Sequence, residues 1–238
     1  MIPCRECGKD SGWTMELVNQ PLFGGNVDVA VCDSCCNEYH EKESEEKTEY
    51  KEFSQEPLTK LIRPLYLETE YNLLPKQAQT VWKNMKYWTP ELGKGLYLLG
   101  ASRQGKSRLL MMLLKQLHDE GHCFKVFYAG EFHAQLAEAK RSAFYKSWRD
   151  EVVNIPILAI DDLFAEKMTP TSEAGLFEVV NQRMERKLPI LCTSQVKRSD
   201  AVDRFDDKSR GQAFMNRLKE TSQLYVFNQD VLQEVAKL

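Results

Sequence analysis

Beyond residue 64, short apolar runs alternate along the chain with longer stretches in which apolar residues recur at helical spacing. A short apolar run is typical of a strand buried on both faces, and alternation of such strands with helices is typical of a parallel sheet covered by helices. The pattern therefore predicts an α/β domain built on a five-stranded parallel sheet. The predicted strands are 96–99, 124–128, 157–160, 189–193 and 224–227.

The residues before this domain follow a different pattern. Residues 41–57 contain seven glutamates and three lysines, with almost no apolar side chains. Such a segment has little to bury and is typical of a solvated helix or a flexible connector. We therefore expect three parts: a small module at 1–40, a charged linker at 41–61 and the α/β domain at 62–238.

Composition limits the class of protein. The formal net charge of −3 disfavours a globally basic nucleic-acid-binding protein and leaves room only for local basic patches. No apolar run approaches the roughly 18 residues of a membrane span, and the first residues lack the apolar segment of a signal peptide. We therefore expect a cytoplasmic protein without a membrane partner.

Five of the seven cysteines precede residue 37, where they form two C-x-x-C pairs. Two such pairs can complete a tetrahedral zinc site, and four thiolates without an open position indicate a structural metal. The predicted zinc ligands are Cys4, Cys7, Cys32 and Cys35. Cys36 or His40 can replace Cys35, and a redox pair or plain reduced thiols are the alternatives. Cys123 and Cys192 are interpreted as buried free thiols.

The sequence GASRQGKS at 100–107, here called the phosphate loop, fits G-x-x-x-x-G-K-[ST]. It lies between a predicted strand and a predicted helix at 108–118, which is the context that a phosphate-binding loop needs. Gly100 and Gly105 permit the backbone angles that point N–H groups at an anion. Lys106 is expected to reach the terminal phosphates, Ser107 to bind Mg²⁺, and Arg108 to belong to the same nucleotide site. The alternative is a plain glycine turn.

Two aspartates, here called the acid pair, follow the third predicted strand. In an open parallel sheet the carboxyl ends of strands line the ligand crevice, so Asp161 is expected to hold Mg²⁺ opposite Ser107. Asp162 is expected to orient the attacking water, and its short side chain predicts slow turnover. The alternative is a strand that ends in a solvated acidic turn. The next strand ends in three candidate sensor residues, Thr193, Ser194 and Gln195.

Several segments together resemble the AAA+ ATPases of the bacterial helicase-loader group, the DnaC/DnaI-like proteins and their transposition-helper relatives. These segments are PLYLETEYNLLP, GLYLLGASRQGKSRLL, ILAIDDLF, LFEVVNQRMERKLPILCTSQ and FMNRLKE. The resemblance covers residues 62–228. It implies that the sensor strand lies between the strands that carry the phosphate loop and the acid pair. It also implies a nucleotide site that a neighbouring subunit completes.

The same resemblance assigns several side chains. Arg217 occupies the place of the arginine finger, which stabilises charge on the transferring phosphoryl group from a neighbouring subunit. Arg183 matches a second basic position, expected at the subunit interface. Gln195 stands where the group usually has asparagine. The expected catalytic set is Asp161, Asp162, Gln195 and Arg217. Only ten residues follow Asn228, so no C-terminal lid is expected.

Residues 137–150 (AEAKRSAFYKSWRD) mix cations with aromatic rings. That mixture suits single-stranded DNA, because cations bind the backbone and rings stack on bases. The candidate DNA-binding residues are Lys140, Arg141, Lys146 and Arg149. However, Phe144 and Trp148 lie four residues apart, which also suits a helix that packs its aromatic side chains on the sheet.

These features lead to one functional expectation and three rivals. The resemblance implies an ATP-hydrolysing helicase loader that uses ATP, Mg²⁺ and Zn²⁺, assembles as a homo-oligomer on ATP and binds single-stranded DNA. Its zinc module is expected to contact a DnaB-like replicative helicase, with Trp13, Leu22 and Phe23 as candidate contacts or as the module's small core. The rivals are an IstB-like transposition helper, a zinc-bearing nucleoside kinase and an adaptor that binds ATP without hydrolysing it.

Overall fold

In the computed structural model of the chain, residues 15–22, 25–32 and 56–227 are described. The chain divides into two compact units, 1–52 and 53–238. Among the described residues, no helix has both the length and the apolar character that crossing a bilayer requires.

The first unit contains an antiparallel hairpin of β1 (Met15–Leu22) and β2 (Gly25–Cys32). Cys32 is the last residue of β2. The other three predicted zinc ligands and both alternatives, Cys36 and His40, lie outside the described residues, as do Trp13 and Phe23. The zinc site therefore stays a prediction.

The second unit is built on a parallel sheet of five strands in the order β4-β5-β6-β3-β7. The strands are β3 (Gly95–Gly100), β4 (Phe124–Tyr128), β5 (Ile157–Asp161), β6 (Ile190–Ser194) and β7 (Ser222–Phe227). All five predicted strands are confirmed, with bounds that differ by at most two residues. The predicted central place of β6, between β5 and β3, is confirmed as well.

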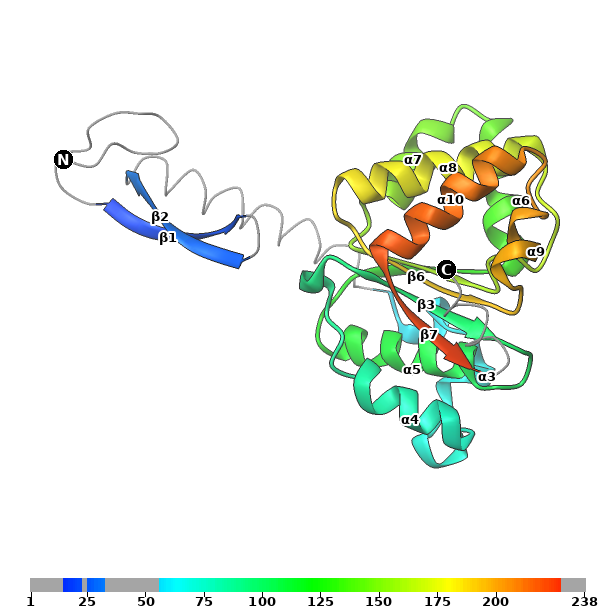
Figure 1. Ribbon diagram of the computed structural model, residues 1–238, viewed down its shortest axis with the longest axis horizontal. Coiled ribbons are helices and arrows are strands. Elements are labelled where there is room, and N and C mark those ends of the chain that lie inside the picture. Colours follow the sequence, from blue (N-terminus) through cyan, green and yellow to red (C-terminus); the bar gives the residue numbers. More distant parts are fainter. Residues whose placement is uncertain (1–14, 23–24, 33–55, 228–238) are drawn as a thin grey trace. The chain divides into compact units, whose positions relative to one another are not determined.

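Helices cover both faces of this sheet (Figure 1). On one side lie α4 (Lys76–Met85) and α5 (Lys106–Asp119). On the other lie α6 (Ala129–Lys140), α7 (Tyr145–Asn154), α8 (Pro170–Glu185) and α10 (Lys208–Thr221). Shorter elements are α2 (Leu58–Leu61), α3 (Pro64–Leu67), η1 (Tyr71–Leu73), η2 (Pro90–Leu92) and α9 (Arg198–Val202).

The sheet separates two hydrophobic clusters. Leu96 and Leu98 of β3 pack into the cluster on the α4 and α5 side, while Tyr97 and Leu99 pack into the cluster on the α8 and α10 side. Successive strand residues point to opposite faces, so a fully apolar strand serves both clusters. This explains why the central strands read as unbroken apolar runs in the sequence.

Candidate nucleotide site

The phosphate loop joins the end of β3 to the start of α5. Gly105 has φ of +88°, a left-handed conformation that glycine adopts without steric cost. Its place is also tight, because a Cβ atom there would lie 3.1 Å from the Ala78 Cβ and 3.2 Å from Pro75 Cδ. Gly100 must be glycine for a different reason, since a Cβ there would lie 2.4 Å from the carbonyl oxygen of Phe227. The loop thus leads directly into the N-terminus of α5, where free N–H groups attract anions.

Lys106 begins α5 and is buried, with 5% of its surface exposed. Its Nζ donates a hydrogen bond to the carbonyl oxygen of Ala101, at 2.8 Å, so the side chain bends back over the loop. Burial lowers the pKa of Lys106, and the nearby charges of Asp162 and Asp161 oppose that shift. A buried ammonium group placed inside an N–H-lined loop suits a phosphate ligand.

Asp161, the last residue of β5, is the buried member of the acid pair. Thr193 Oγ1 on β6 donates to its Oδ1 at 2.7 Å, and Ser107 on α5 also interacts with this carboxylate. Burial raises the pKa of Asp161, while Thr193 and Ser107 act in the opposite direction. The hydroxyl of Ser107 and the carboxylate of Asp161 are hard oxygen ligands, so this donor set fits Mg²⁺.

Asp162 lies outside the strand and has φ of +59°. Its backbone N–H donates to Thr193 Oγ1 at 2.9 Å, which links the two aspartates through one hydroxyl. Gln195 Nε2 lies 3.0 Å and 2.8 Å from the two carboxylate oxygens of Asp162. The three candidate sensor residues therefore differ: Thr193 binds both aspartates, Gln195 binds Asp162, and Ser194 Oγ donates to the carbonyl of Val196 at 3.3 Å.

Two contacts in this neighbourhood join residues that lie far apart in the sequence. Arg108, expected in the nucleotide site, donates from Nη1 to Thr69 Oγ1 at 3.0 Å. Tyr66 on α3 interacts with Ser107 and with the charges of both aspartates, and burial is the main cause of its raised pKa. Because Tyr66 is far from Ser107 in sequence, only the folded chain brings the two together.

Arg217 lies on α10, away from the phosphate loop in sequence. Its guanidinium carbon lies 4.5 Å from the centroid of the Phe177 ring. Its Nη1 is buried without a hydrogen-bond partner in the described part of the chain. A guanidinium that is stacked but not neutralised can still receive an anion.

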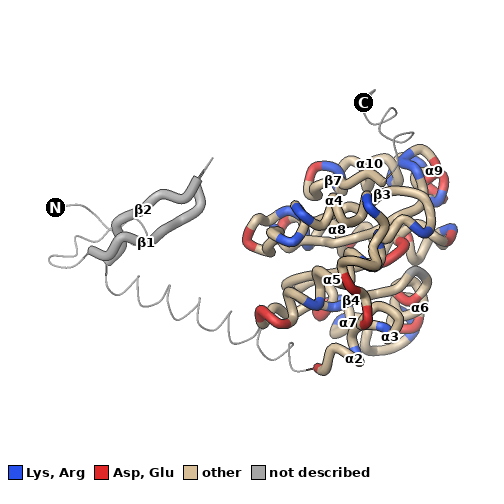
Figure 2. Tube along the Cα trace, turned by 90° about the horizontal axis from the view of Figure 1, so that it is seen from below, with Lys and Arg blue, Asp and Glu red and all other residues tan. Residues whose placement is uncertain are grey.

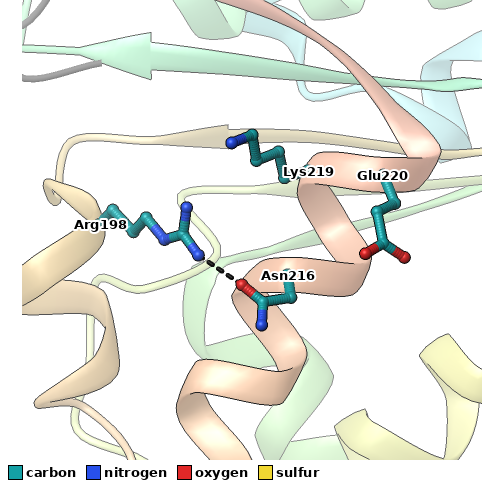
Figure 3. Close-up of a pocket in the computed structure, with 4 residues that line it drawn as sticks. All are labelled: Arg198, Asn216, Lys219 and Glu220. Atoms are coloured by element: carbon teal, nitrogen blue, oxygen red, sulfur yellow. Dashed lines mark hydrogen bonds between the residues drawn. The ribbon is translucent and has the colours of Figure 1, made fainter. Parts of the chain in front are cut away.

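Beside Arg217 along the helix is a surface hollow of about 480 Å³, shown in Figure 3. Its lining residues are Arg198, Asn216, Lys219 and Glu220. Arg198 Nη2 donates to Asn216 Oδ1 at 2.5 Å and so joins α9 to α10. We call this region, with Arg217, the α10 surface.

Arg183 does not lie at a surface, and the expectation of an interface position is wrong. The side chain is fully buried, and its guanidinium donates five hydrogen bonds of 2.7–3.1 Å to carbonyl oxygens. The acceptors are Val152, Val153, Ile155, Pro156 and Pro189. Carbonyl groups at the C-terminal end of a helix lack hydrogen-bond donors within that helix. Arg183 supplies such donors to the carbonyl groups at the end of α7. Burial lowers the pKa of Arg183 to about 9.

The chain matches the family described as IstB-like ATP binding protein over residues 71–235. That range includes the phosphate loop, the acid pair and Arg217. The chain belongs to this IstB-like family.

Relatives of this IstB-like chain include a replication protein. The replicative helicase loader DnaI of Bacillus subtilis (strain 168) is 27% identical over 121 residues, which cover 50% of this chain and 39% of the relative. The match thus spans well under half of that relative. A solved DnaC helicase loader has a TM-score of 0.60 at 20% identity, over 69% of this chain and 99% of the other. AMPPCP-bound DnaA from Aquifex aeolicus has a TM-score of 0.56 at 15% identity, over 74% and 54%. These likenesses show the AAA+ P-loop fold.

The candidate DNA-binding residues of the IstB-like domain fall into two groups. Lys140, Arg141 and Lys146 are exposed. Arg149 instead forms ion pairs with Asp150 at 2.8 Å and with Glu178 at 3.4 Å. Figure 2 shows basic and acidic residues interspersed along the described helices.

The aromatic side chains of the same stretch also separate. Trp148 packs against Phe127 and Phe132, with ring centroids 6.4 Å and 5.7 Å away. Phe144 is 74% exposed, because it caps α7 instead of lying within the helix. The expectation of aromatic packing therefore holds for Trp148 and fails for Phe144, which lies in the connection between α6 and α7.

Proposed function

We propose that this chain is an ATP-hydrolysing loader of a replicative helicase. The observation that carries the ATPase part is the hydrogen-bonded set of Asp161, Asp162, Thr193 and Gln195 at the end of the sheet, facing the phosphate loop. The similarity to the DnaI loader supports the choice of client.

In the proposed reaction, water attacks the γ-phosphorus of ATP, and the bond to the β-phosphate oxygen breaks to give ADP and phosphate. Mg²⁺, held by Ser107 and Asp161, would neutralise part of the phosphate charge. Lys106 and the N-terminus of α5 bind the phosphates. Asp162 orients the water, and Gln195 fixes the Asp162 carboxylate. Arg217 of a neighbouring subunit stabilises the charge that develops on the phosphoryl group.

Binding of single-stranded DNA is proposed for the exposed turn after α6. Lys140, Arg141 and Lys146 would bind the backbone, and Phe144 would stack on a base. Phe144→Ala is expected to weaken binding to a fluorescent single-stranded oligonucleotide by about 5–30-fold. Arg149→Ala is the matched control, since Arg149 is already paired, and an effect as large as that of Phe144→Ala would contradict the assignment.

Native mass spectrometry tests the loader function. The full chain is mixed with the replicative helicase of its own host, with and without ATP and Mg²⁺. A defined complex that is lost when residues 1–45 are deleted supports the proposal and places the contact in the first unit. Self-assembly on ATP without bound helicase contradicts the choice of client.

A second candidate is favoured by the family itself, which is named for IstB. A transposition helper would keep the same ATPase site and would deliver a transposase to duplex DNA. Preferred binding to duplex over single-stranded DNA, together with no helicase complex, would favour this candidate.

A further inference from the structure

The guanidinium group of Arg217 is held by its flat face and not through its N–H donors. Its carbon lies over the Phe177 ring, 4.5 Å from the ring centroid, which is the distance of a cation–π contact. Within the described part of the chain the guanidinium forms no hydrogen bond or ion pair, and its Nη1 is buried without a partner. An aromatic ring fixes the plane of a guanidinium and leaves its N–H edge available, whereas a carboxylate would occupy that edge and neutralise the charge.

The Phe177 ring belongs to a well-packed part of the domain. Phe177 lies on α8 and packs, half-buried, against the hydrophobic cluster that α8 shares with α10. Leu176 on α8 and Phe214 and Leu218 on α10 are fully buried in the same cluster. The two helices lie side by side (Figure 1). The core therefore fixes the backbone on both sides of the stacked pair.

A buried ion pair fixes the same interface between α8 and α10. Glu173 on α8 has 1% of its surface exposed, and it accepts from Arg210 Nη1 on α10 at 3.0 Å. Glu173 precedes Phe177 by four residues, and Arg210 precedes Arg217 by seven. Residues at these spacings share one face of a helix, so the ion pair and the stacked pair lie along the same interface. Because the two helices are held there, contact with the Phe177 ring restricts the rotation of the Arg217 side chain.

We propose that Phe177 is a positioning residue for Arg217, whose guanidinium it holds so that the free N–H groups meet the phosphate of a nucleotide bound by a neighbouring subunit. The inference rests on the proposed role of Arg217 in the ATPase reaction. An arginine side chain has many rotamers, and ordering it in advance reduces the entropy that is lost when it contacts the phosphate. Phe177 touches no reacting atom and acts only through Arg217.

The test is a double-mutant cycle in the full chain, which measures phosphate release and the affinity for a non-hydrolysable ATP analogue. Phe177→Leu keeps an apolar side chain against the cluster and removes the ring. It is expected to lower turnover about 3–10-fold, which is the size of one cation–π contact, with analogue affinity within about twofold of the wild type. Phe177→Tyr keeps the ring and should retain turnover within about twofold.

The cycle separates positioning from packing. In an Arg217→Ala chain the ring has no guanidinium to hold, so adding Phe177→Leu should change the residual turnover by less than about twofold. Val179→Ala is the matched control, since Val179 lies on the same helix and is buried in the same cluster. It should lower the midpoint of chemical denaturation and leave turnover per folded molecule unchanged.

Three outcomes would overturn the inference while the ATPase function stands. They are wild-type turnover by Phe177→Leu, an equal loss in Phe177→Tyr, and a Phe177→Leu loss that is the same with and without Arg217. If Arg217→Ala itself keeps wild-type turnover, the proposed role of Arg217 is wrong and the inference falls with it.

Discussion

Charged groups lie in two regions, at the carboxyl ends of β3, β5 and β6 and on the α10 surface. The two regions differ in how deeply these groups are buried and in whether they have hydrogen-bond partners. At the strand ends, Lys106 and Asp161 are buried, and hydrogen bonds already fix the acid pair. On the α10 surface, Lys219 and Glu220 are exposed, and Arg217 has a nitrogen without a partner in the described residues. Burial of paired charges produces a rigid, preformed site, whereas an unpaired guanidinium nitrogen keeps hydrogen-bonding capacity for a further partner. This difference is what we expect if, as proposed above, one chain carries a nearly complete half-site and the complement for another.

The largest effect is expected from removal of the buried lysine. Lys106→Ala deletes the ammonium group inside the phosphate loop and should weaken nucleotide binding by roughly 100-fold or more, with loss of turnover. Titration calorimetry and a phosphate-release assay measure the two quantities. Lys86→Ala, at the end of α4, is the control and should bind normally. Tight binding by Lys106→Ala would show that the preformed half-site is not where nucleotide binds.

Loss of Arg217 should separate binding from turnover. Arg217→Ala is expected to keep nucleotide affinity within about threefold but to reduce turnover by roughly 100- to 1,000-fold, because the guanidinium acts only on the transition state. Lys219→Ala, on the same helix, should change turnover by less than about threefold. Equal turnover of Arg217→Ala and wild type would remove the α10 surface from the reaction.

Arg183 sharpens the comparison, since it is an arginine with a purely structural environment. Arg183→Met removes the donor of five hydrogen bonds to carbonyl oxygens, most of them buried, and should lower the free energy of unfolding by about 3–5 kcal/mol. Chemical denaturation measures this loss. Turnover per folded molecule should be unchanged, and a specific loss of turnover in fully folded Arg183→Met would contradict a purely structural role.

A smaller effect is expected from Gln195→Asn. The shorter side chain cannot reach both Asp162 oxygens, so turnover should fall about tenfold at unchanged nucleotide affinity. The helicase-loader group usually has asparagine at this place. Equal or faster turnover by Gln195→Asn would therefore mean that the residue acts on the phosphate directly and not through Asp162.

The sequence predicted the elements whose signals are local. Apolar runs located all five strands, and the phosphate loop and acid pair followed from residue spacing within single segments. Residue contacts across the chain were not predictable in this way. Arg183 stands among charged residues in the sequence, yet it meets carbonyl groups from the end of α7 and from Pro189 just before β6, and no local pattern shows that convergence.

The position of a helix boundary explains why Phe144 does not pack as the sequence predicted. Phe144 and Trp148 would share a face of one continuous helix, but α7 begins at Tyr145, so Phe144 belongs to the turn and is exposed. Tyr66 illustrates the same limit at longer range, because its relation to Ser107 depends on the packing of α3 against β4 and α5. Sequence spacing carries no information about such packing.

The most direct test of the account mixes two inactive variants and measures phosphate release. Asp162→Asn keeps Arg217 but lacks the carboxylate that orients water, and Arg217→Ala keeps Asp162 but lacks the arginine. If a neighbouring subunit completes each site, an equal mixture should recover about a quarter of wild-type turnover, since one interface in four then joins the two intact halves. A mixture no more active than the average of the separate variants would contradict the account.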